Sequence, residues 1–257
     1  MQRLSPFPID RSLFAAYNAP AMQPQRTLIA GHRGARGLAP ENTIEAFEKA
    51  IELGADMVEF DVRRTADGTL VIHHDEDIAG KPLRDLSYKQ LPELKGIRVP
   101  TFEEVLHLCA GRIAVDIELK EAGCEEAVLE LVSEHANPDE VIITSFIDGV
   151  VARIKEIDSS VRTGLLVGLN LPNPLCASLF GPFPFRRCAK VGADIIVPHF
   201  SLLRFGFLKR ARKRGYPVYV WTVNDEAKTE QLIEAGVDAI ITDFPDRALE
   251  IRSKHSG

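Results

Sequence analysis

Eight short runs of β-branched and other apolar residues recur along this chain, and each is followed by a stretch with the spacing of an amphipathic helix. Runs that are apolar at nearly every position are typical of parallel strands, because helices cover both faces of a parallel sheet. The pattern therefore predicts strands at Thr27–His32, Asp56–Arg63 (extended by Thr69–His74), Arg112–Leu119, Val141–Phe146, Arg162–Val167, Asp194–His199, Pro217–Val223 and Ala239–Asp243.

The number and length of these units favour one closed barrel. A chain of 257 residues has the usual length of a TIM barrel, and its 45% of hydrophobic residues can fill one large core. An open doubly wound sheet is the alternative, but no glycine-rich phosphate fingerprint follows the first strand. We therefore predict an α/β fold, a (β/α)8 TIM barrel with a short excursion after strand 2. A single domain is expected over residues 26–257, behind an N-terminal extension, residues 1–25.

Local signals mark several of the helix ends. Helical spacing of apolar residues is clearest over Asn42–Leu53 and Thr101–Ala110. Three Gly-X-Asp triplets recur where a helix is expected to end and a strand to begin, which places them at the lower rim of the barrel. These are Gly54-Ala55-Asp56, Gly192-Ala193-Asp194 and Gly236-Val237-Asp238.

Two segments interrupt the alternation. Asp75–Pro100 separates the second strand from its helix, and the proline-rich apolar stretch Asn170–Phe185 follows the fifth strand. Both connections follow the carboxyl end of a strand. We therefore expect both at the end of the barrel where binding sites are built.

Charge and cysteine content narrow the class of protein. The chain has 31 basic and 37 acidic residues and a formal charge of -6, so no nucleic-acid partner is expected. Its four cysteines lie far apart, without a zinc-like or disulfide-like spacing. Neither a signal peptide nor a membrane-spanning stretch is indicated, and we predict a cytoplasmic protein with reduced thiols.

Three predicted strands carry polar residues where a barrel strand is expected to be apolar. Alternate residues of a strand share a face, so these side chains gather near the carboxyl ends. They are Glu59, Asp61 and Arg63 on the second strand, Asp116, Glu118 and Lys120 on the third, and His32 and Arg33 at the end of the first.

Carboxylates that gather in a barrel mouth repel one another unless a cation lies among them. An all-oxygen ligand set suits Mg²⁺, Ca²⁺ or Mn²⁺ better than zinc. The alternative is that these carboxylates form ion pairs with Arg63 and Lys120 inside the barrel. We favour that alternative for Asp116, because it lies deeper in its strand.

Short motifs follow one another along the chain in a specific order. They are Gly31-His32-Arg33-Gly34, Pro40-Glu41-Asn42-Thr43, Glu59-Phe60-Asp61-Val62, His74-Asp75, Glu118-Leu119-Lys120, Trp221-Thr222-Val223-Asn224 and Thr242-Asp243-Phe244-Pro245-Asp246. Their order and spacing closely resemble those of the glycerophosphodiester phosphodiesterase family, from about residue 27 to residue 250.

This resemblance implies an activity and a set of roles. The activity is metal-dependent hydrolysis of glycerophosphodiesters to glycerol 3-phosphate and an alcohol, with the glycerol 2-hydroxyl as first nucleophile. One divalent cation, Mg²⁺ or Ca²⁺ with Mn²⁺ as a further option, would be bound. Its ligands would be Glu59, Asp61 and Glu118, with Glu41 as a further ligand or orienting group. His32 and His74 would be the general acid and base. Arg33 and Lys120 would neutralise phosphate oxygens.

Other candidate residues can be interpreted either as part of the site or as ordinary structural residues. Trp221 is expected either to stack on substrate at the barrel mouth or to pack in the core. His73 is adjacent to His74 and faces the opposite way, so it is expected to be a packed or surface histidine. His199, near the end of the sixth strand, is a weak site candidate. The basic run Lys209–Arg214 is expected to be the solvated face of an outer helix.

The sequence also departs from the family pattern, and this keeps other functions open. The family often has a longer insertion with an Arg-Thr-Thr element after the His-Asp pair, and this is absent here. A lysophospholipase D is one alternative, because the segment from Leu169 to Phe185 carries the apolar residues Leu171, Leu175, Leu179, Phe180, Phe183 and Phe185. That segment is also where membrane contact would occur, although modest or no lipid preference is expected.

A catalytically silent barrel that binds phosphate esters is the alternative of another class. Every assigned ligand and both histidines are present, which favours an enzyme with a small-molecule glycerophosphodiester substrate. The sequence leaves the oligomeric state and the alcohol group of the substrate open.

Overall fold

The computed structural model describes residues 26–91, 98–168 and 184–255. Within these residues, eight parallel strands stand side by side in the order β10-β11-β1-β2-β6-β7-β8-β9. Bridges from Ile196 to Val218 and from His199 to Trp221 join β9 to β10, which brings the two ends of this order together. The strands are β1 (Leu28–Gly31), β2 (Met57–Arg64), β6 (Ala114–Leu119), β7 (Val141–Ser145), β8 (Arg162–Val167), β9 (Ile195–Pro198), β10 (Tyr219–Val220) and β11 (Ala239–Thr242).

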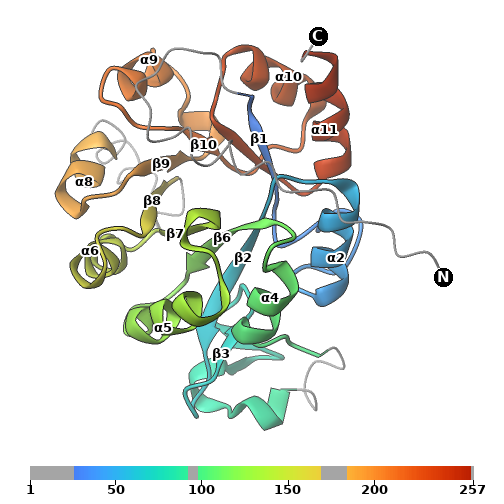
Figure 1. Cartoon of the computed structure of the whole chain (residues 1–257), viewed down its shortest axis with the longest axis vertical. Coiled ribbons are helices and arrows are strands. Elements are labelled where there is room, and N and C mark those ends of the chain that lie inside the picture. The colour runs from blue at the N-terminus through green and yellow to red at the C-terminus, as the bar shows by residue number, and fades with distance from the viewer. Residues whose placement is uncertain (1–25, 92–97, 169–183, 256–257) are drawn as a thin grey trace.

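Helices surround this ring of strands (Figure 1). They are α2 (Ile44–Leu53), α4 (Phe102–Cys109), α5 (Glu125–His135), α6 (Asp148–Ile157), α8 (Pro184–Val191), α9 (Phe207–Arg212), α10 (Glu226–Glu234) and α11 (Pro245–Lys254). The two helices that the sequence predicts most clearly, α2 and α4, each begin after an N-cap residue. The side-chain hydroxyls of Thr43 and Thr101 accept hydrogen bonds from backbone N–H groups in the first turns of α2 and α4. The prediction of a TIM barrel is confirmed.

The side chains that fill the barrel interior change from apolar to acidic along the strands. All eight strands contribute to one inner apolar cluster, with residues such as Met57 of β2 and Ala114 of β6. Positions two and four residues further along β2 are Glu59 and Asp61, and the position two residues further along β6 is Asp116. Alternate residues of a strand share a face, so all of these side chains point into the barrel. The inner face is therefore apolar near the amino ends of these strands and acidic toward their carboxyl ends.

The Gly-X-Asp triplets lie where each strand begins, as predicted. Their glycines have φ between 69° and 76°, the left-handed region that ends a helix without strain for glycine. Each aspartate then accepts a hydrogen bond from a backbone N–H of the neighbouring strand. The pairs are Asp56 with Ile29 (2.7 Å), Asp194 with Thr163 (2.8 Å) and Asp238 with Val218 (2.7 Å).

The segment Thr69–His74 does not extend the second strand, so that part of the prediction is wrong. It contains β3 (Leu70–Ile72), which pairs antiparallel to β2. The chain reverses at Gly68, whose φ is 85°, and the Thr65 hydroxyl donates to Asp67 within the turn. The local turn residues therefore produce a hairpin where the apolar pattern alone suggested one long strand.

The predicted excursion over Asp75–Pro100 is present in its described part. It contains a small hairpin of β4 (Asp77–Ile78) and β5 (Lys81–Pro82) and the short 3-10 helices η2 (Leu83–Asp85) and η3 (Tyr88–Gln90). A separate apolar cluster holds it together, formed by Val71, Ile78, Leu83, Leu86, Leu91 and Val99.

Two predicted segments lie wholly or mainly outside the described residues. They are the N-terminal extension, residues 1–25, and the apolar segment from Leu169, of which only the last residues are described. Phe185 belongs to α8, is 9% exposed, and packs against Phe207 with ring centroids 5.0 Å apart. It is therefore part of the core and not of an exposed apolar patch.

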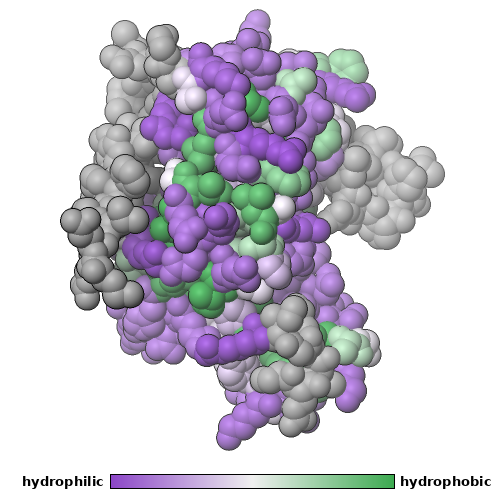
Figure 2. Space-filling model, turned by 90° about the vertical axis from the view of Figure 1, so that its right-hand side faces the viewer, coloured by the Kyte–Doolittle hydropathy of each residue, from purple (hydrophilic) through white to green (hydrophobic). Residues whose placement is uncertain are grey.

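The outer surface matches the predicted polarity of the helices. In the run Lys209–Arg214 every basic residue is exposed and only Ala211 is buried, which confirms a solvated helix face. Figure 2 shows the side that carries α2 and α11, where hydrophilic residues cover most of the surface and hydrophobic residues form a strip near the middle. Among the described residues, no helix is long and apolar enough to cross a membrane.

Candidate active site at the carboxyl end of the barrel

Three buried carboxylates converge at the end of two neighbouring strands. Glu59 and Asp61 come from β2 and Glu118 from β6, and each offers an oxygen within 4.8 Å of the others. Parallel pairing sets Asp61 directly beside Glu118 in the sheet. This group, called the acidic cluster below, lies above the apolar layers of the barrel interior.

The acidic cluster is short of positive charge. Burial and the neighbouring carboxylates raise the pKa of Glu59 well above its ordinary value, and burial raises the pKa of Glu118 to about 7. Burial acts the same way on Asp61, but the charges of Lys120 and Arg33 outweigh it and lower the pKa of that carboxyl. Protons would therefore compete for this site unless another cation occupies it.

Lys120 and Arg33 both lie against the acidic cluster, as predicted. The Lys120 ammonium is 2.7 Å from Glu118 and 3.2 Å from Asp61. Arg33 Nε is 3.3 Å from Asp61, and the backbone N–H of Arg33 donates to Glu59 at 2.9 Å. Both side chains are 12% exposed, so only a small part of each is accessible from outside the site.

The loop after β1 is tightly folded to place Arg33. Gly34 has φ 81°, and a Cβ there would lie 2.6 Å from the backbone of Ala46 in α2. Arg33 itself has φ 51°, an uncommon conformation for a residue with a side chain. Such backbone geometry is costly and is typical of functional loops that the surrounding packing holds in place.

Glu41 lies beside the arginines and not within the acidic cluster. One of its carboxylate oxygens accepts a hydrogen bond from Arg33 (2.9 Å), and the other forms an ion pair with Arg36 Nε (2.8 Å). In this arrangement Glu41 orients Arg33 toward the acidic cluster. Whether Glu41 acts as a further metal ligand or as an orienting group stays a prediction.

His32 follows β1 and is held by Asp243, which follows β11. The two residues meet because Gly31 and Thr242, just before them, are paired in the sheet. His32 Nδ1 is 2.6 Å from Asp243 Oδ1, and the Asn224 amide donates to the other oxygen at 2.7 Å. A carboxylate only accepts, so Nδ1 carries the proton, and Nε2 lies 3.9 Å from Glu59.

Asp243 remains ionised in this setting. Burial raises the pKa of Asp243, but the hydrogen bond and charge of His32 and the Asn224 amide outweigh it and hold the pKa below its ordinary value. Neither Asp243 nor Asn224 was singled out from the sequence as a functional residue. Their only signal was their presence in the two late motifs.

His74 is held in a similar way by its neighbour Asp75, with Nδ1 2.7 Å from Oδ1. Burial and the positive charge of Lys120 lower the pKa of His74, against the opposing effect of Asp61. His73 faces elsewhere, because it is buried and its Nε2 lies 3.1 Å from the Asp77 carbonyl. The prediction that His73 is a packed histidine is confirmed.

Asn42 is a further residue that the motifs contained but that was not assigned. It is 4% exposed and its amide donates to Asp61 Oδ2 at 2.8 Å. Its φ of 56° and its backbone hydrogen bond to Arg33 fix this placement. Asn42 therefore fixes the orientation of Asp61 within the acidic cluster.

The interior ion pair predicted for Asp116, with Arg63 or Lys120, is not formed among the described residues. Lys120 pairs instead with Asp61 and Glu118. In the described part of the chain, Asp116 is 1% exposed and accepts a hydrogen bond from the Thr144 hydroxyl at 2.8 Å. Arg63 donates instead to the His74 carbonyl at 2.8 Å. Burial raises the pKa of Asp116 to about 7, so a neutral hydroxyl partner suffices where a cation was expected.

Trp221 is mainly a packed residue. Its indole N–H donates to the Val197 carbonyl at 2.9 Å, and its ring meets Phe146 and His199 edge to face at 5.3 Å and 5.1 Å. His199 Nδ1 is 2.8 Å from the Ser201 hydroxyl. A role of Trp221 in stacking on substrate stays a prediction.

Comparison with known proteins identifies the family to which this chain belongs. The sequence profile of the glycerophosphoryl diester phosphodiesterase family matches residues 32–247. The chain belongs to this family. The match spans every residue of the acidic cluster, both histidines and Asp243, and the chain is an enzyme of this family.

Individual relatives agree with the family match. A glycerophosphodiester phosphodiesterase from Caldanaerobacter subterraneus subsp. tengcongensis is 31% identical over 250 residues, which cover 89% of this chain and 99% of that protein. A solved structure of a glycerophosphodiester phosphodiesterase from Thermotoga maritima superposes with a TM-score of 0.73 at 29% identity, over 88% of this chain and 98% of the other.

A more distant relative has a different named activity. It is a lysophospholipase D from Homo sapiens, 25% identical over 262 residues, which cover 84% of this chain and 83% of that protein. Proteins similar to this chain therefore carry either name.

Proposed function

We propose that this protein hydrolyses glycerophosphodiesters to glycerol 3-phosphate and an alcohol, with one divalent cation bound by Glu59, Asp61 and Glu118. The observation that carries the proposal is the convergence of these three buried carboxylates. Two histidines lie beside them, each held at Nδ1 by a carboxylate. The family membership adds the substrate class.

The acidic cluster fits a hard divalent cation. It offers only oxygen ligands, which Mg²⁺, Ca²⁺ and Mn²⁺ prefer. Asp61 Oδ1 is buried and lacks a hydrogen-bond donor of good geometry, and the pKa values of Glu59 and Glu118 are raised. When bound, such a cation would neutralise the carboxylates and polarise a phosphoryl oxygen.

The histidines supply the proton transfers that phosphodiester cleavage requires. The attacking hydroxyl must lose a proton, and the leaving alkoxide must gain one. Because burial and Lys120 lower its pKa, His74 is neutral at physiological pH and can accept a proton, so we assign it the role of base. This leaves the role of acid to His32, with Asp243 as its positioning residue.

Arg33 and Lys120 supply two positive charges beside the acidic cluster. Both lie against Asp61 of the acidic cluster, and both keep their charge because the pKa of each is raised by the neighbouring carboxylates against the effect of burial. Positive groups placed where negative charge develops on the phosphoryl oxygens lower the barrier to cleavage. We assign these two residues that role.

The proposed activity predicts metal-dependent release of glycerol 3-phosphate from glycerophosphocholine, glycerophosphoethanolamine or glycerophosphoglycerol. Release is expected with Mg²⁺, Ca²⁺ or Mn²⁺, loss with chelator, and recovery when metal is restored. Cleavage of lysophosphatidylcholine alone would establish the lysophospholipase D alternative. Binding of a glycerophosphodiester without cleavage of any diester or lysolipid would establish the silent binding barrel.

One exposed feature of the surface is suited to contact with a lipid substrate. Phe205 is 91% exposed and follows β9 at the carboxyl end of the barrel, and the basic residues of α9 come directly after it. An exposed aromatic residue beside basic residues is suited to contact with anionic lipid. We expect modest or no lipid preference, which a comparison of kcat/KM for the two substrate classes measures.

Replacing Asp243 by asparagine is expected to lower kcat by about 10²-fold while KM changes little. An amide can donate to His32 as well as accept from it, so the imidazole would no longer be held in one tautomer. The measurement is the separation of kcat from KM, with thermal unfolding as the control for folding. An unchanged kcat in a folded Asp243→Asn variant would show that Asp243 does not position His32.

The cysteines agree with a reducing compartment. Cys109, Cys124 and Cys188 are free and buried, and burial raises the pKa of each thiol to about 12. Cys176 lies outside the described residues. We therefore propose a cytoplasmic location, in which free thiols persist.

A further inference from the structure

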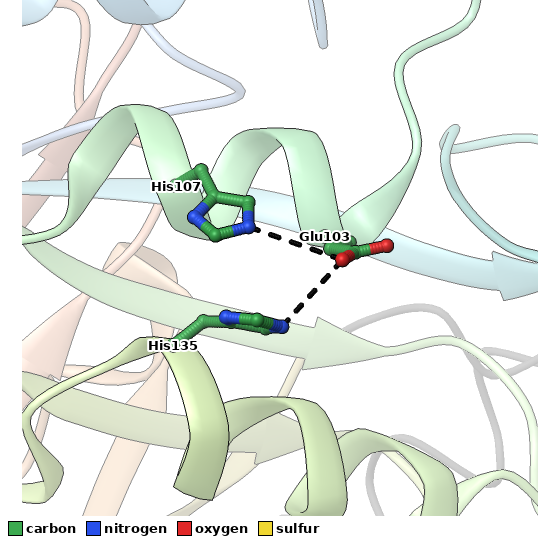
Figure 3. A group of neighbouring side chains, drawn as sticks. All are labelled: Glu103, His107 and His135. Atoms are coloured by element: carbon green, nitrogen blue, oxygen red, sulfur yellow. Dashed lines mark ion pairs between the residues drawn. The ribbon is translucent and has the colours of Figure 1, made fainter.

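A second group of metal-ligating side chains lies outside the barrel, on the helices α4 and α5 (Figure 3). Glu103 and His107 are on α4, and His135 is the last residue of α5. Each offers one ligand atom within 4.8 Å of the others. This group is called the histidine cluster below, and none of its members belongs to the proposed active site.

The local structure explains why the three side chains converge. Glu103 and His107 are four residues apart on one helix, so they lie on the same face one turn apart. The neighbouring helix brings His135 alongside, with the two imidazole rings 4.3 Å apart between centroids. Figure 3 shows both rings turning a nitrogen toward the carboxylate of Glu103.

The distances are close to those of a metal site. The Nε2 atoms of His135 and His107 lie 3.6 Å and 3.9 Å from Glu103 Oε1. Ligands about 2.0–2.2 Å from a tetrahedral zinc ion are separated by about 3.3–3.6 Å. Small side-chain rotations would therefore complete the geometry, and the exposed position leaves room for water as a fourth ligand.

We propose that the histidine cluster binds one zinc ion, or a similar borderline divalent ion, and thereby links α4 to α5. Two imidazoles and one carboxylate suit Zn²⁺, whereas the oxygen-only acidic cluster suits a hard ion. The link would stabilise the part of the barrel around β6, because α4 precedes β6 and α5 follows it. This inference does not depend on the proposed function.

The surface offers a matched control for this proposal. His255 Nε2 also faces two carboxylates, those of Glu230 at 3.5 Å and Glu234 at 3.7 Å. Its side chain is 25% exposed, close to the 19% of His135. His135 likewise lies 3.6 Å from two carboxylates, those of Glu103 and Glu134. Among the described residues His255 belongs to no such group of metal-ligating side chains, so it is expected to contribute little to zinc affinity.

The test is equilibrium dialysis against Zn²⁺ in the presence of excess Mg²⁺, with thermal unfolding measured in parallel. His107→Ala is the first variant, because that side chain is 60% exposed and the fold does not depend on it. The expected result is the loss of one bound zinc per chain in His107→Ala and in His135→Ala, and no loss in His255→Ala.

Zinc should also stabilise the unaltered protein. At a free concentration about 100 times Kd, binding to the folded state alone is expected to raise Tm by about 5–10 °C. This rise should disappear in His107→Ala and persist in His255→Ala. Equal zinc stoichiometry in the unaltered protein and both cluster variants, or an equal loss in His255→Ala, would overturn the proposal.

Discussion

Replacing His74 by glutamine is expected to lower kcat by about 10²–10⁴-fold, the usual contribution of a general acid or base. Glutamine has a similar size and keeps a hydrogen-bond donor for Asp75, but it cannot take up a proton from the attacking hydroxyl. The measurement is steady-state hydrolysis of the best glycerophosphodiester at saturating metal. A fall in kcat without loss of folded protein is the expected outcome.

The adjacent histidine provides the control. His73→Gln alters a buried imidazole that lies 3.1 Å from the Asp77 carbonyl, away from the acidic cluster. We expect this variant to lose stability but to keep kcat within a few-fold of the unaltered protein. Equal losses of kcat in the two variants would mean that His74 has no special part in proton transfer.

The pH profile adds a second readout for His74. Burial and Lys120 lower the pKa of His74 from its ordinary 6.5, so the base form persists at lower pH than for an exposed histidine. As pH falls through this lowered pKa, His74 becomes protonated and the rate declines. The acidic limb of kcat/KM should therefore lie below 6.5, and the part due to His74 should be absent in His74→Gln.

The sequence was sufficient to predict the acidic cluster, because two physical rules act together there. Alternation along β2 and β6 puts Glu59, Asp61 and Glu118 on the inner face, and parallel pairing sets the two strands side by side. Carboxylates on the inner face of a barrel strand are costly, so several of them together near the carboxyl end favour a site. The closed barrel followed from the eight repeated units in the same way.

Contacts between residues far apart in the chain could not be predicted. Asp243 holds His32 across 211 residues because β11 and β1 are neighbours, which depends on closure of the barrel. The histidine cluster likewise depends on the packing of α4 against α5, because the spacing of Glu103 and His107 along α4 does not indicate that His135 of α5 lies beside them. These contacts are set by tertiary packing and leave no short-range periodicity in the sequence.

Replacing Glu118 by glutamine is expected to raise the metal concentration needed for half-maximal activity by at least about 10²-fold. Loss of an outer partner of a metal ligand already weakens metal affinity by about 10- to 100-fold, and Glu118 is proposed as a direct ligand. Part of the lost activity should return at high metal concentration. The measurement is a metal-activation curve at fixed substrate.

Asp116→Asn is the matched control, because Asp116 lies on the same strand and the same face, two residues before Glu118. Its side chain is bonded by Thr144, and asparagine can accept the same hydrogen bond. We expect the metal-activation curve of this variant to match that of the unaltered protein.

The Asp116→Asn variant should also be as stable as the unaltered protein at neutral pH. The pKa of Asp116 is raised from 3.8 to about 7, so ionisation favours the unfolded state increasingly as pH rises between these values. A neutral amide removes that cost. If Asp116→Asn instead raised the metal requirement as much as Glu118→Gln, the ion would have to lie deeper in the barrel, between Glu59 and Asp116, and the proposed ligand set would be wrong.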